Sequence, residues 1–405
     1  MLYELHEMQH AALNPLLLWA QTNAGLYSNP YSVLSYLPGS RNVAAGYELL
    51  LRLGQRYEKP EFGLTETTID GETILVHEEV AAHKPFCQLR HFNRATKRQD
   101  PTVLVVAPLS GHHSTLLRDT VRTLLPEHDV YITDWTDARM VPLSEGVFHL
   151  DDYVAYVQEF IRLLGPDVHV ISVCQPTVPV LAAVSLMASN GDLKLPRSMI
   201  MMGGPIDARQ SPTAVNQLAQ RKPYSWFENR LIQHVPAKYP GYMRRVYPGF
   251  LQYAGFVAMN PHRHIESHYD YYLHLVSGDG ESAEAHRKFY DEYNAVQDLP
   301  AEYYLDTIKT VFQEHALPEG RMLVRGERVA PETIRTVALY TIEGELDDIS
   351  GAGQTRAAHQ LCCNIPEKNK HHLTAKGAGH YGIFSGRRWR EEIFPHVRSF
   401  IRRHG

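Results

Sequence analysis

The chain has 405 residues, of which 44% are hydrophobic and 21% are charged, and its net charge is −5. This composition supports a large core, arranged either as one α/β domain with an insertion or as two or three smaller domains. The acidic balance argues against a nucleic-acid-binding protein, which normally shows a basic surface. Four cysteines are too few for a disulfide scaffold, so we expect reduced thiols and a cytoplasmic location.

Membrane and metal signals are weak in this sequence. No apolar stretch approaches the ~20 residues needed to cross a bilayer, and the first residues lack the basic and apolar regions of a secretory signal. The 23 histidines are scattered, and neither an H-E-x-x-H nor a C-x-x-C pattern occurs. We therefore expect no membrane span, no metal and no cofactor.

Residues 1–70 are expected to form a helical N-terminal extension. Apolar residues cluster in 16–20 and 47–53, and a break rich in Pro, Gly and Asn separates these two stretches. We expect the extension to dock on the core, while subunit pairing and contact with an apolar surface remain alternatives.

Residues 71–204 are expected to form the first part of an α/β core. Residues 73–80 and 85–92 alternate like half-buried strands and predict an antiparallel hairpin. After them, apolar strands alternate with helices, which predicts a doubly wound, mostly parallel sheet. The expected strands are 102–108, 129–135, 168–173 and 198–204, and the expected helices are 114–125, 150–164 and 177–188.

Residues 205–331 interrupt this alternation and are expected to form a helical cap rich in aromatic residues. An insertion at this point would lie over the carboxyl ends of the strands, where substrates bind. Aromatic side chains offer apolar area with polar tips. The candidates for substrate contact are Trp226, Phe227, Tyr271 and Tyr272, and packing inside the cap is the alternative for each of them.

Residues 332–405 are expected to complete the core. Residues 337–344 and 372–375 predict the last two strands, and residues 353–361 and 386–403 predict the helices that follow them.

The stretch around Cys174 has the layout of a nucleophile elbow. An apolar, β-branched strand ends at Cys174, and a buried helix follows it. In α/β-hydrolases this sharp turn presents the nucleophile at the end of the sheet, and the helix N-terminus favours a thiolate and a developing oxyanion. Ser172 and Pro176 stand where glycines are usual. A buried structural cysteine is the alternative interpretation.

Asp347 and His380 each follow an expected strand, and nucleophile, acid, histidine is the chain order of α/β-hydrolases. In this arrangement Cys174 attacks an acyl carbon, His380 moves the proton, and Asp347 orients the imidazole. Asp348 is the rival acid. We prefer Asp347 because it stands third after Gly344, the usual turn spacing for this acid.

The oxyanion hole is expected to combine two backbone N–H groups. One belongs to Gln175, and the other comes from the turn after residues 102–108, with Ser110 or Leu109 as the donor. Leu109 and His112 of the same turn are further candidates for substrate contact.

Four motifs resemble those of the intracellular polyhydroxyalkanoate depolymerases, and the likeness extends over nearly the whole chain. The motifs are Ser172-Val173-Cys174-Gln175-Pro176, Ala107-Pro108-Leu109-Ser110-Gly111-His112-His113, Glu343-Gly344-Glu345-Leu346-Asp347-Asp348-Ile349-Ser350-Gly351 and Gly379-His380-Tyr381-Gly382-Ile383-Phe384. A Cys-Gln-Pro elbow is unusual among hydrolases and distinguishes this family from the polymer synthases, which also use a cysteine.

The resemblance implies an α/β-hydrolase fold and a cytoplasmic enzyme at the surface of storage granules. Such an enzyme hydrolyses native poly(3-hydroxybutyrate) to 3-hydroxybutyrate units or oligomers. The resemblance also implies Cys174 as nucleophile, Asp347 as acid and His380 as base. Two alternatives are an acyltransferase or polymer synthase-like thiol enzyme, and a non-catalytic granule-associated protein. Transfer to coenzyme A, chain-length preference, endo or exo attack and a homodimer are left open.

Overall fold

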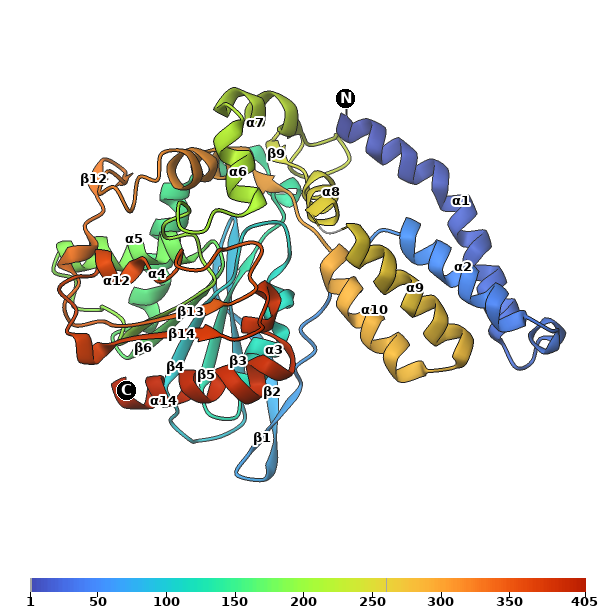
Figure 1. Cartoon of the computed structure of the whole chain (residues 1–405), viewed down its shortest axis with the longest axis horizontal. Coiled ribbons are helices and arrows are strands. Elements are labelled where there is room, and N and C mark those ends of the chain that lie inside the picture. Colours follow the sequence, from blue (N-terminus) through green and yellow to red (C-terminus); the bar gives the residue numbers. More distant parts are fainter. Residues whose placement is uncertain (1, 260) are drawn as a thin grey trace.

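A computed structural model describes residues 2–259 and 261–405, and a sheet of nine strands lies at its centre (Figure 1). The strand order is β1-β2-β3-β5-β4-β6-β7-β13-β14. The first three strands and β5 pair antiparallel, and the six strands from β5 to β14 run parallel. The bounds are β1 Glu66–Ile69, β2 Glu72–Lys84, β3 Cys87–Arg94, β4 Thr102–Val106, β5 Asp129–Trp135, β6 Val168–Val173, β7 Ser198–Met202, β13 Ala338–Gly344 and β14 Lys370–Ala375.

Helices lie in front of and behind the strands in Figure 1. They follow the strands of the parallel part and bury their apolar faces against it, which is the layering of a doubly wound α/β sheet. Their bounds are α3 Arg118–Leu124, α4 Leu150–Leu164, α5 Thr177–Ser189, α12 Ala358–Leu361, α13 Gly386–Arg388 and α14 Phe394–His404.

The middle of the sheet holds the most deeply buried elements. All six residues of β6 are buried, because β6 pairs with β4 on one side and β7 on the other. Helix α5 is buried from Thr177 to Met187. Such uniformly apolar segments are typical of parallel sheets covered on both faces. The core therefore surrounds the turn between β6 and α5.

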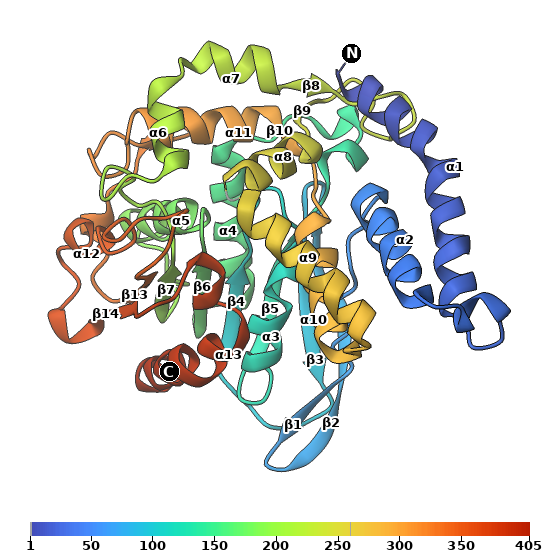
Figure 2. The same ribbon diagram turned by 45° about the vertical axis from the view of Figure 1, so that its right-hand side comes forward.

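The segment between β7 and β13 contains mostly helices. Helices α6, α7 and α11 lie above the strands in Figure 2, and α9 and α10 lie to one side of the sheet in Figure 1. The elements are α6 Ala214–Arg221, α7 Tyr224–Leu231, β8 Gln233–His234, β9 Arg245–Tyr247, α8 Gly249–Met259, α9 Pro261–Ser277, α10 Gly280–Asn294, β10 Leu299–Pro300, α11 Ala301–Thr307, a π-helical turn Ile308–Gln313, β11 Leu323–Val324 and β12 Glu327–Arg328.

The N-terminal arm, residues 2–54, consists of α1 (Leu2–Ser28), a short 3₁₀ helix η1 (Val33–Tyr36) and α2 (Ser40–Gly54). Helices α1 and α2 pack as a hairpin, and α2 packs on α9. In Figure 2 the arm stands to the right of the α9–α10 pair, and this pair lies in front of the strands. Helix α2 therefore contacts the α9–α10 pair, while the buried Tyr3 at the start of α1 packs with Ala138, Val235 and Val246.

The predicted strands and most predicted helices are confirmed. Strand β1 was missed, although Asp70-Gly71 is a strong hairpin signal and both residues have the positive φ of such a turn. The predicted helix 353–361 shortens to α12, and the predicted closing helix contains a π-helical turn, Trp389–Ile393. The division into four parts remains a prediction, because α9 of the third part packs on α2 of the first.

Candidate active site

Cys174 sits in a strained turn between β6 and α5. Its φ of 67° lies in the left-handed region, which is uncommon for a residue other than glycine. The backbone N–H of Cys174 donates to Met202 O at 2.7 Å, and Thr177 N–H donates to Cys174 O at 3.2 Å. These bonds hold the backbone in the conformation that points a nucleophile away from the sheet, as in the elbow of an α/β-hydrolase.

Two glycines after β7 make room for this turn. A Cβ added to Gly204 would lie 1.8 Å from Thr177 Oγ1 and 2.5 Å from Cys174 O. Gly203 has a φ of +58°, and a Cβ there would lie 3.3 Å from Asp347 Oδ2. Glycines beside the nucleophile usually let the strand and the helix approach each other closely. Here Gly203 and Gly204, which follow β7, provide that space.

The Asp347 carboxylate is buried and fixed by three hydrogen bonds. Its Oδ1 accepts from Ile349 N–H at 2.9 Å and Ser350 N–H at 2.8 Å. Its Oδ2 accepts from His380 Nδ1 at 2.8 Å. Asp348 is exposed at the neighbouring position. Asp347, the acid preferred from the sequence, thus contacts the imidazole, and its catalytic role remains a prediction.

His380 is buried between Asp347 and Cys174. Burial lowers the pKa of His380, but the negative charges of Cys174 and Asp347 and hydrogen bonds to both side chains outweigh burial and raise it well above its ordinary value. The imidazole is thus oriented by one partner and coupled to the other. This is the geometry that base catalysis by histidine needs.

Several backbone N–H groups near Cys174 are free to donate to an anion. Within residues 2–259 and 261–405, the backbone N–H groups of Gln175, Leu109 and Ser110 donate to no protein acceptor. Gln175 opens the turn into α5, whose N-terminus carries a partial positive charge. Gly111, with a φ of 115°, reverses the chain after Ser110. These positions are those at which oxyanion-hole donors were predicted.

His112 lies in an aromatic wall next to the triad. Its ring stacks on Phe256 at 4.8 Å between centroids, and its Nε2 contacts Tyr293 O at 3.1 Å. Burial lowers the pKa of His112 to about 4, so the ring is neutral near pH 7. Tyr381 packs against both His112 and His380. Leu109 is buried in the same turn. The wall is therefore uncharged and apolar.

Sequence reasoning missed most of this wall. Phe256 and Tyr293 come from α8 and α10, in an insertion whose aromatic residues are too numerous to rank by composition. Tyr381 could have been found, because it directly follows the predicted histidine. Tyr303 of α11 was also missed. Its hydroxyl is buried, and burial, followed by the nearby Cys174, raises the pKa of Tyr303 well above its ordinary value.

Two of the four predicted cap aromatics pack inside the insertion, and the other two contact the arm. Phe227 is buried in a small cluster with Leu305 and Ile308, and Trp226 packs edge-on against it. Tyr271 is buried against His286 and bonds Glu48 of α2, and Tyr272 accepts from Asn42 at 3.3 Å. None of these contacts is with the triad, so their role in substrate contact remains a prediction.

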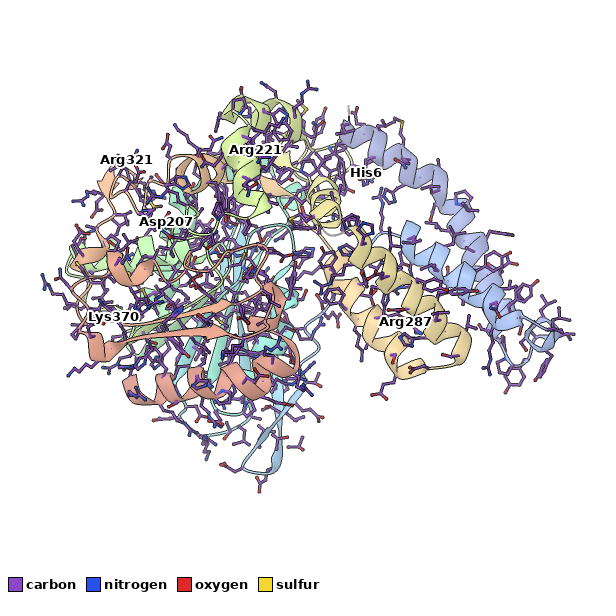
Figure 3. All side chains as sticks on the ribbon, in the orientation of Figure 1. His6, Asp207, Arg221, Arg287, Arg321 and Lys370 are labelled. Atoms are coloured by element: carbon purple, nitrogen blue, oxygen red, sulfur yellow. The ribbon has the colours of Figure 1, made fainter. Side chains whose placement is uncertain are left out.

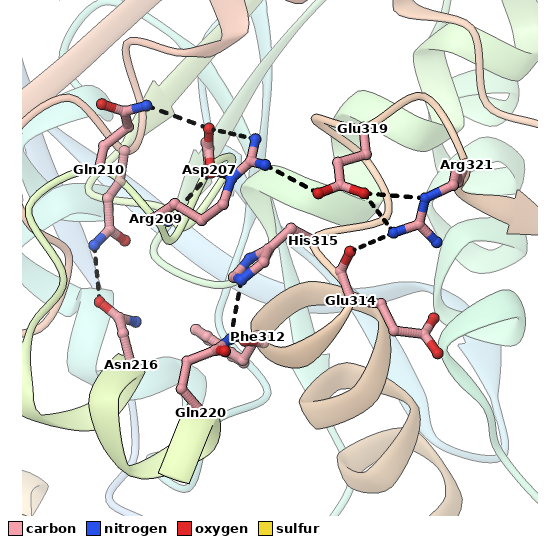
Figure 4. A network of polar contacts seen from close by, with 11 residues as sticks. Asp207, Arg209, Gln210, Asn216, Gln220, Phe312, Glu314, His315, Glu319 and Arg321 are labelled. Carbon is pink, nitrogen blue, oxygen red and sulfur yellow. Dashed lines mark hydrogen bonds and ion pairs between the residues drawn. The ribbon is translucent and has the colours of Figure 1, made fainter.

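The base of the insertion supports the loop that carries Asp347. Gln354 donates to Asn216 Oδ1 at 2.8 Å, and Thr213 donates to Ile349 O at 3.1 Å. Asp207 N–H donates to Gln354 O at 3.1 Å, and the Asp207 carboxylate accepts from Arg209, which also donates to Glu319 (Figure 4). The insertion therefore contacts the segment that follows Asp347.

A cavity of about 970 Å³ lies between α1 and the ends of β3 and β5. Charged side chains such as Lys59, Asp134 and Arg139 line it, and most are paired with one another. Neither Cys174 nor His380 lines this cavity, so it is a separate feature from the triad.

The described residues show neither a metal centre nor a bilayer-crossing helix. Across 2–259 and 261–405, no three or more His, Cys, Asp or Glu side chains are grouped to hold a metal ion. No helix in these ranges combines the length and apolarity that crossing a membrane would require.

The sheet order and the elbow define an α/β-hydrolase fold. A family model described as the PHB depolymerase C-terminus matches residues 203–405. The chain belongs to this PHB depolymerase family, and this membership places it among the ester hydrolases.

Three of the solved structures that resemble this chain are a lipase and two esterases. A monoacylglycerol lipase of Paleococcus ferrophilus has 14% identity and a TM-score of 0.45, covering 75% of this chain and 95% of that one. A carboxylesterase of Nitrososphaera gargenis has 10% identity and a TM-score of 0.44, covering 81% and 100%. An esterase of Thermogutta terrifontis has 12% identity and a TM-score of 0.40, covering 84% and 97%. Among curated proteins, none matches this sequence.

Proposed function

We propose that the chain is an intracellular depolymerase that hydrolyses the ester bonds of poly(3-hydroxybutyrate) and related polyhydroxyalkanoates at storage granules in the cytoplasm. The observation that carries this proposal is the contact of Asp347 with His380 at 2.8 Å, beside a cysteine in the strained turn after β6. Family membership supplies the substrate class.

In the first half of the reaction, Cys174 Sγ attacks the ester carbonyl as a thiolate, with its proton held on His380 Nε2. The carbonyl oxygen becomes an oxyanion, to which the N–H groups of Gln175 and Ser110 donate. When the intermediate collapses, the carbon–oxygen bond of the ester breaks. His380 gives its proton to the leaving hydroxyl end of the polymer, and an acyl thioester remains on Cys174.

In the second half, His380 Nε2 takes a proton from water, and the hydroxide attacks the thioester. Collapse releases the carboxylic acid end and restores the thiolate–imidazolium pair. Asp347 accepts the Nδ1–H bond throughout and stabilises the charged imidazole. Leu109 and His112 would line the acyl side of the site, because both are buried and uncharged next to the triad.

We also propose that residues 205–331 act as the cap of this site, between core segments 71–204 and 332–405. Two observations support this role of the insertion. Tyr303 lies near enough to Cys174 for Cys174 to raise its pKa. The rings of Phe256 and Tyr293 pack against the ring of His112. The cap aromatics Trp226, Phe227, Tyr271 and Tyr272 are given no part in catalysis.

The test is incubation of the purified protein with amorphous poly(3-hydroxybutyrate), with and without coenzyme A, followed by identification of the products. We expect 3-hydroxybutyrate or its oligomers in both cases. Cys174→Ala should release none, and Cys363→Ala, which changes an exposed cysteine, should match the parent. Products formed only as coenzyme A thioesters would show an acyltransferase instead. Granule binding without any products would show a non-catalytic granule protein.

A further inference from the structure

The first part of the chain contains a long stretch without formal charge. From Met8 to Ser40 there is no Asp, Glu, Lys or Arg, although 21% of the whole chain is charged. Only His10 in this stretch can take up a proton near neutral pH, and burial lowers its pKa. Surface helices usually carry charged residues on their outer face, so this absence requires a reason.

This stretch is exposed at the turn of the arm. We define the arm tip as residues 28–40, the turn between α1 and α2 that contains η1. Tyr31 is 96% exposed, Val33 81% and Tyr36 76%. Leu26 and Leu37, at the two sides of the tip, are also exposed, and so are Leu16, Leu18 and Trp19 in the middle of α1. Large apolar side chains exposed together at one projecting turn are typical of an interaction site.

The tip projects from the molecule and bonds only to itself. Every hydrogen bond that residues 29–40 make within the described chain joins two residues of 25–43. Figure 1 shows the tip at the far end of the arm, away from the sheet. Burying its apolar side chains on a partner would therefore break no contact with the core.

The opposite end of the arm is fastened to the insertion, residues 205–331. Tyr3 is buried and donates to Asp298 at 2.6 Å, and Glu7 accepts from Tyr239 at 3.0 Å. The ring of His6, labelled in Figure 3, stacks on Phe250 of α8 with 4.0 Å between the ring centroids. Helix α2 is held by Arg52, which donates to Asp291 at 2.6 Å. The arm is thus a fixed extension with an apolar, uncharged tip.

We propose that the arm tip docks on the surface of the solid polyester, so that Tyr31, Val33 and their apolar neighbours bury against it; this inference rests on the proposed polymer substrate. A polyester offers methyl and methylene groups together with ester oxygens, which accept hydrogen bonds and cannot donate them. The Tyr31 hydroxyl and the Trp19 N–H donate to no acceptor within the described residues, so both are available to these oxygens.

The absence of charge favours this partner over two others. A protein interface normally carries a polar, charged rim and is enriched in Arg. A helix that lies on a phospholipid surface normally carries Lys or Arg on its polar face. Residues 8–40 contain neither Lys nor Arg, and no acidic residue. The polyester surface has no charges with which a charged side chain could pair. A charge on the arm tip would therefore lose its hydration on docking without gaining a partner.

The test is co-sedimentation with lipid-free amorphous poly(3-hydroxybutyrate) particles, using the full chain with Cys174→Ala so that the particles persist. Tyr31→Ser with Val33→Ser should reduce binding at least about tenfold, because two apolar side chains no longer become buried. The matched control is Leu193→Ser with Leu323→Ser, which removes two exposed leucines outside the arm and should bind as the parent does. Binding by the parent should persist in 1 M salt.

Four results would overturn the inference. Equal binding of the arm variant and the parent would remove the tip and leave the proposed function intact. Failure of the parent to bind would remove the polymer substrate as well. Stronger binding to phosphatidylcholine vesicles than to polymer would identify a lipid surface. A dimer in light scattering that becomes a monomer only in the arm variant would identify a second copy as the occupant.

Discussion

Two stretches of this chain lack charged residues, and they lie in opposite environments. Residues 168–191 form β6, the Cys174 turn and α5, and nearly all of their side chains are buried. Residues 8–40 form most of the arm, where the aromatic and aliphatic side chains of the tip are exposed. Similar composition therefore serves packing in one stretch and leaves an apolar surface in the other.

The comparison shows that a missing charge has a different cause in each place. In the core, a charge would be buried without a partner, which is costly. On the arm, solvent could hydrate a charge at little cost, so its absence indicates a partner that excludes water. Substitutions at buried residues, and at the point where the arm joins them, separate these two causes.

The largest effect is expected at the buried acid. Asp347→Asn should lower kcat for ester hydrolysis about 10⁴-fold, because the amide favours the wrong imidazole tautomer. Asp348→Asn, at the exposed neighbouring position, is the matched control and should retain most of the activity. The measurement is steady-state hydrolysis of a soluble 3-hydroxybutyrate oligomer. A greater loss in Asp348→Asn would transfer the role of acid to Asp348.

A smaller effect separates a buried aromatic from an exposed one. Phe227→Ala should lower the free energy of unfolding by about 3–5 kcal/mol, because Phe227 is buried against Leu305 and Ile308. Tyr31→Ala should change it by no more than about 0.5 kcal/mol, since Tyr31 is exposed. Urea unfolding measures both. Equal losses would mean that the arm tip is packed in solution.

The most gradual effect concerns pH at the joint where Tyr3 of the arm meets Asp137 and Asp298. Burial, followed by the charge of Asp298, raises the pKa of Asp137 to about 7. The folded protein therefore binds more protons than the unfolded chain between about pH 4 and 7. Over this range the free energy of unfolding should fall as pH rises, by at most about 1.4 kcal/mol per pH unit, and level off above pH 7.

Asp137→Asn is the control for this pH dependence. Asparagine keeps an oxygen that can accept from Asp298 N–H and Arg139 N–H, as Asp137 Oδ1 does. The variant should show a shallower slope when unfolding is followed at pH 5, 6, 7 and 8. Parallel curves for the parent and the variant would show that Asp137 does not titrate in this range.

The sequence predicted the sheet and the positions of Cys174, Asp347 and His380, because parallel strands bring their carboxyl ends to one edge. It missed Gly203-Gly204, since the need for these glycines arises from the approach of β7 to the Cys174 turn, which no local pattern reveals.

The aromatic wall was missed for a related reason. Residues 205–331 are rich in aromatics, and only tertiary packing decides which of them face the triad. Phe256 reaches His112, whereas Phe227 and Tyr271 pack elsewhere. The exposure of the arm tip was equally hidden, because an apolar segment normally predicts burial.

The most direct test of the central claim is to identify the acylated residue during turnover. The parent protein is mixed with a 3-hydroxybutyrate oligomer, quenched in acid within one turnover, digested and analysed by mass spectrometry. The account predicts a 3-hydroxybutyryl group on the peptide that contains Cys174, and its absence in Cys174→Ala. Hydrolysis at the parent rate in Cys174→Ala, or an acyl group on another residue, would contradict it.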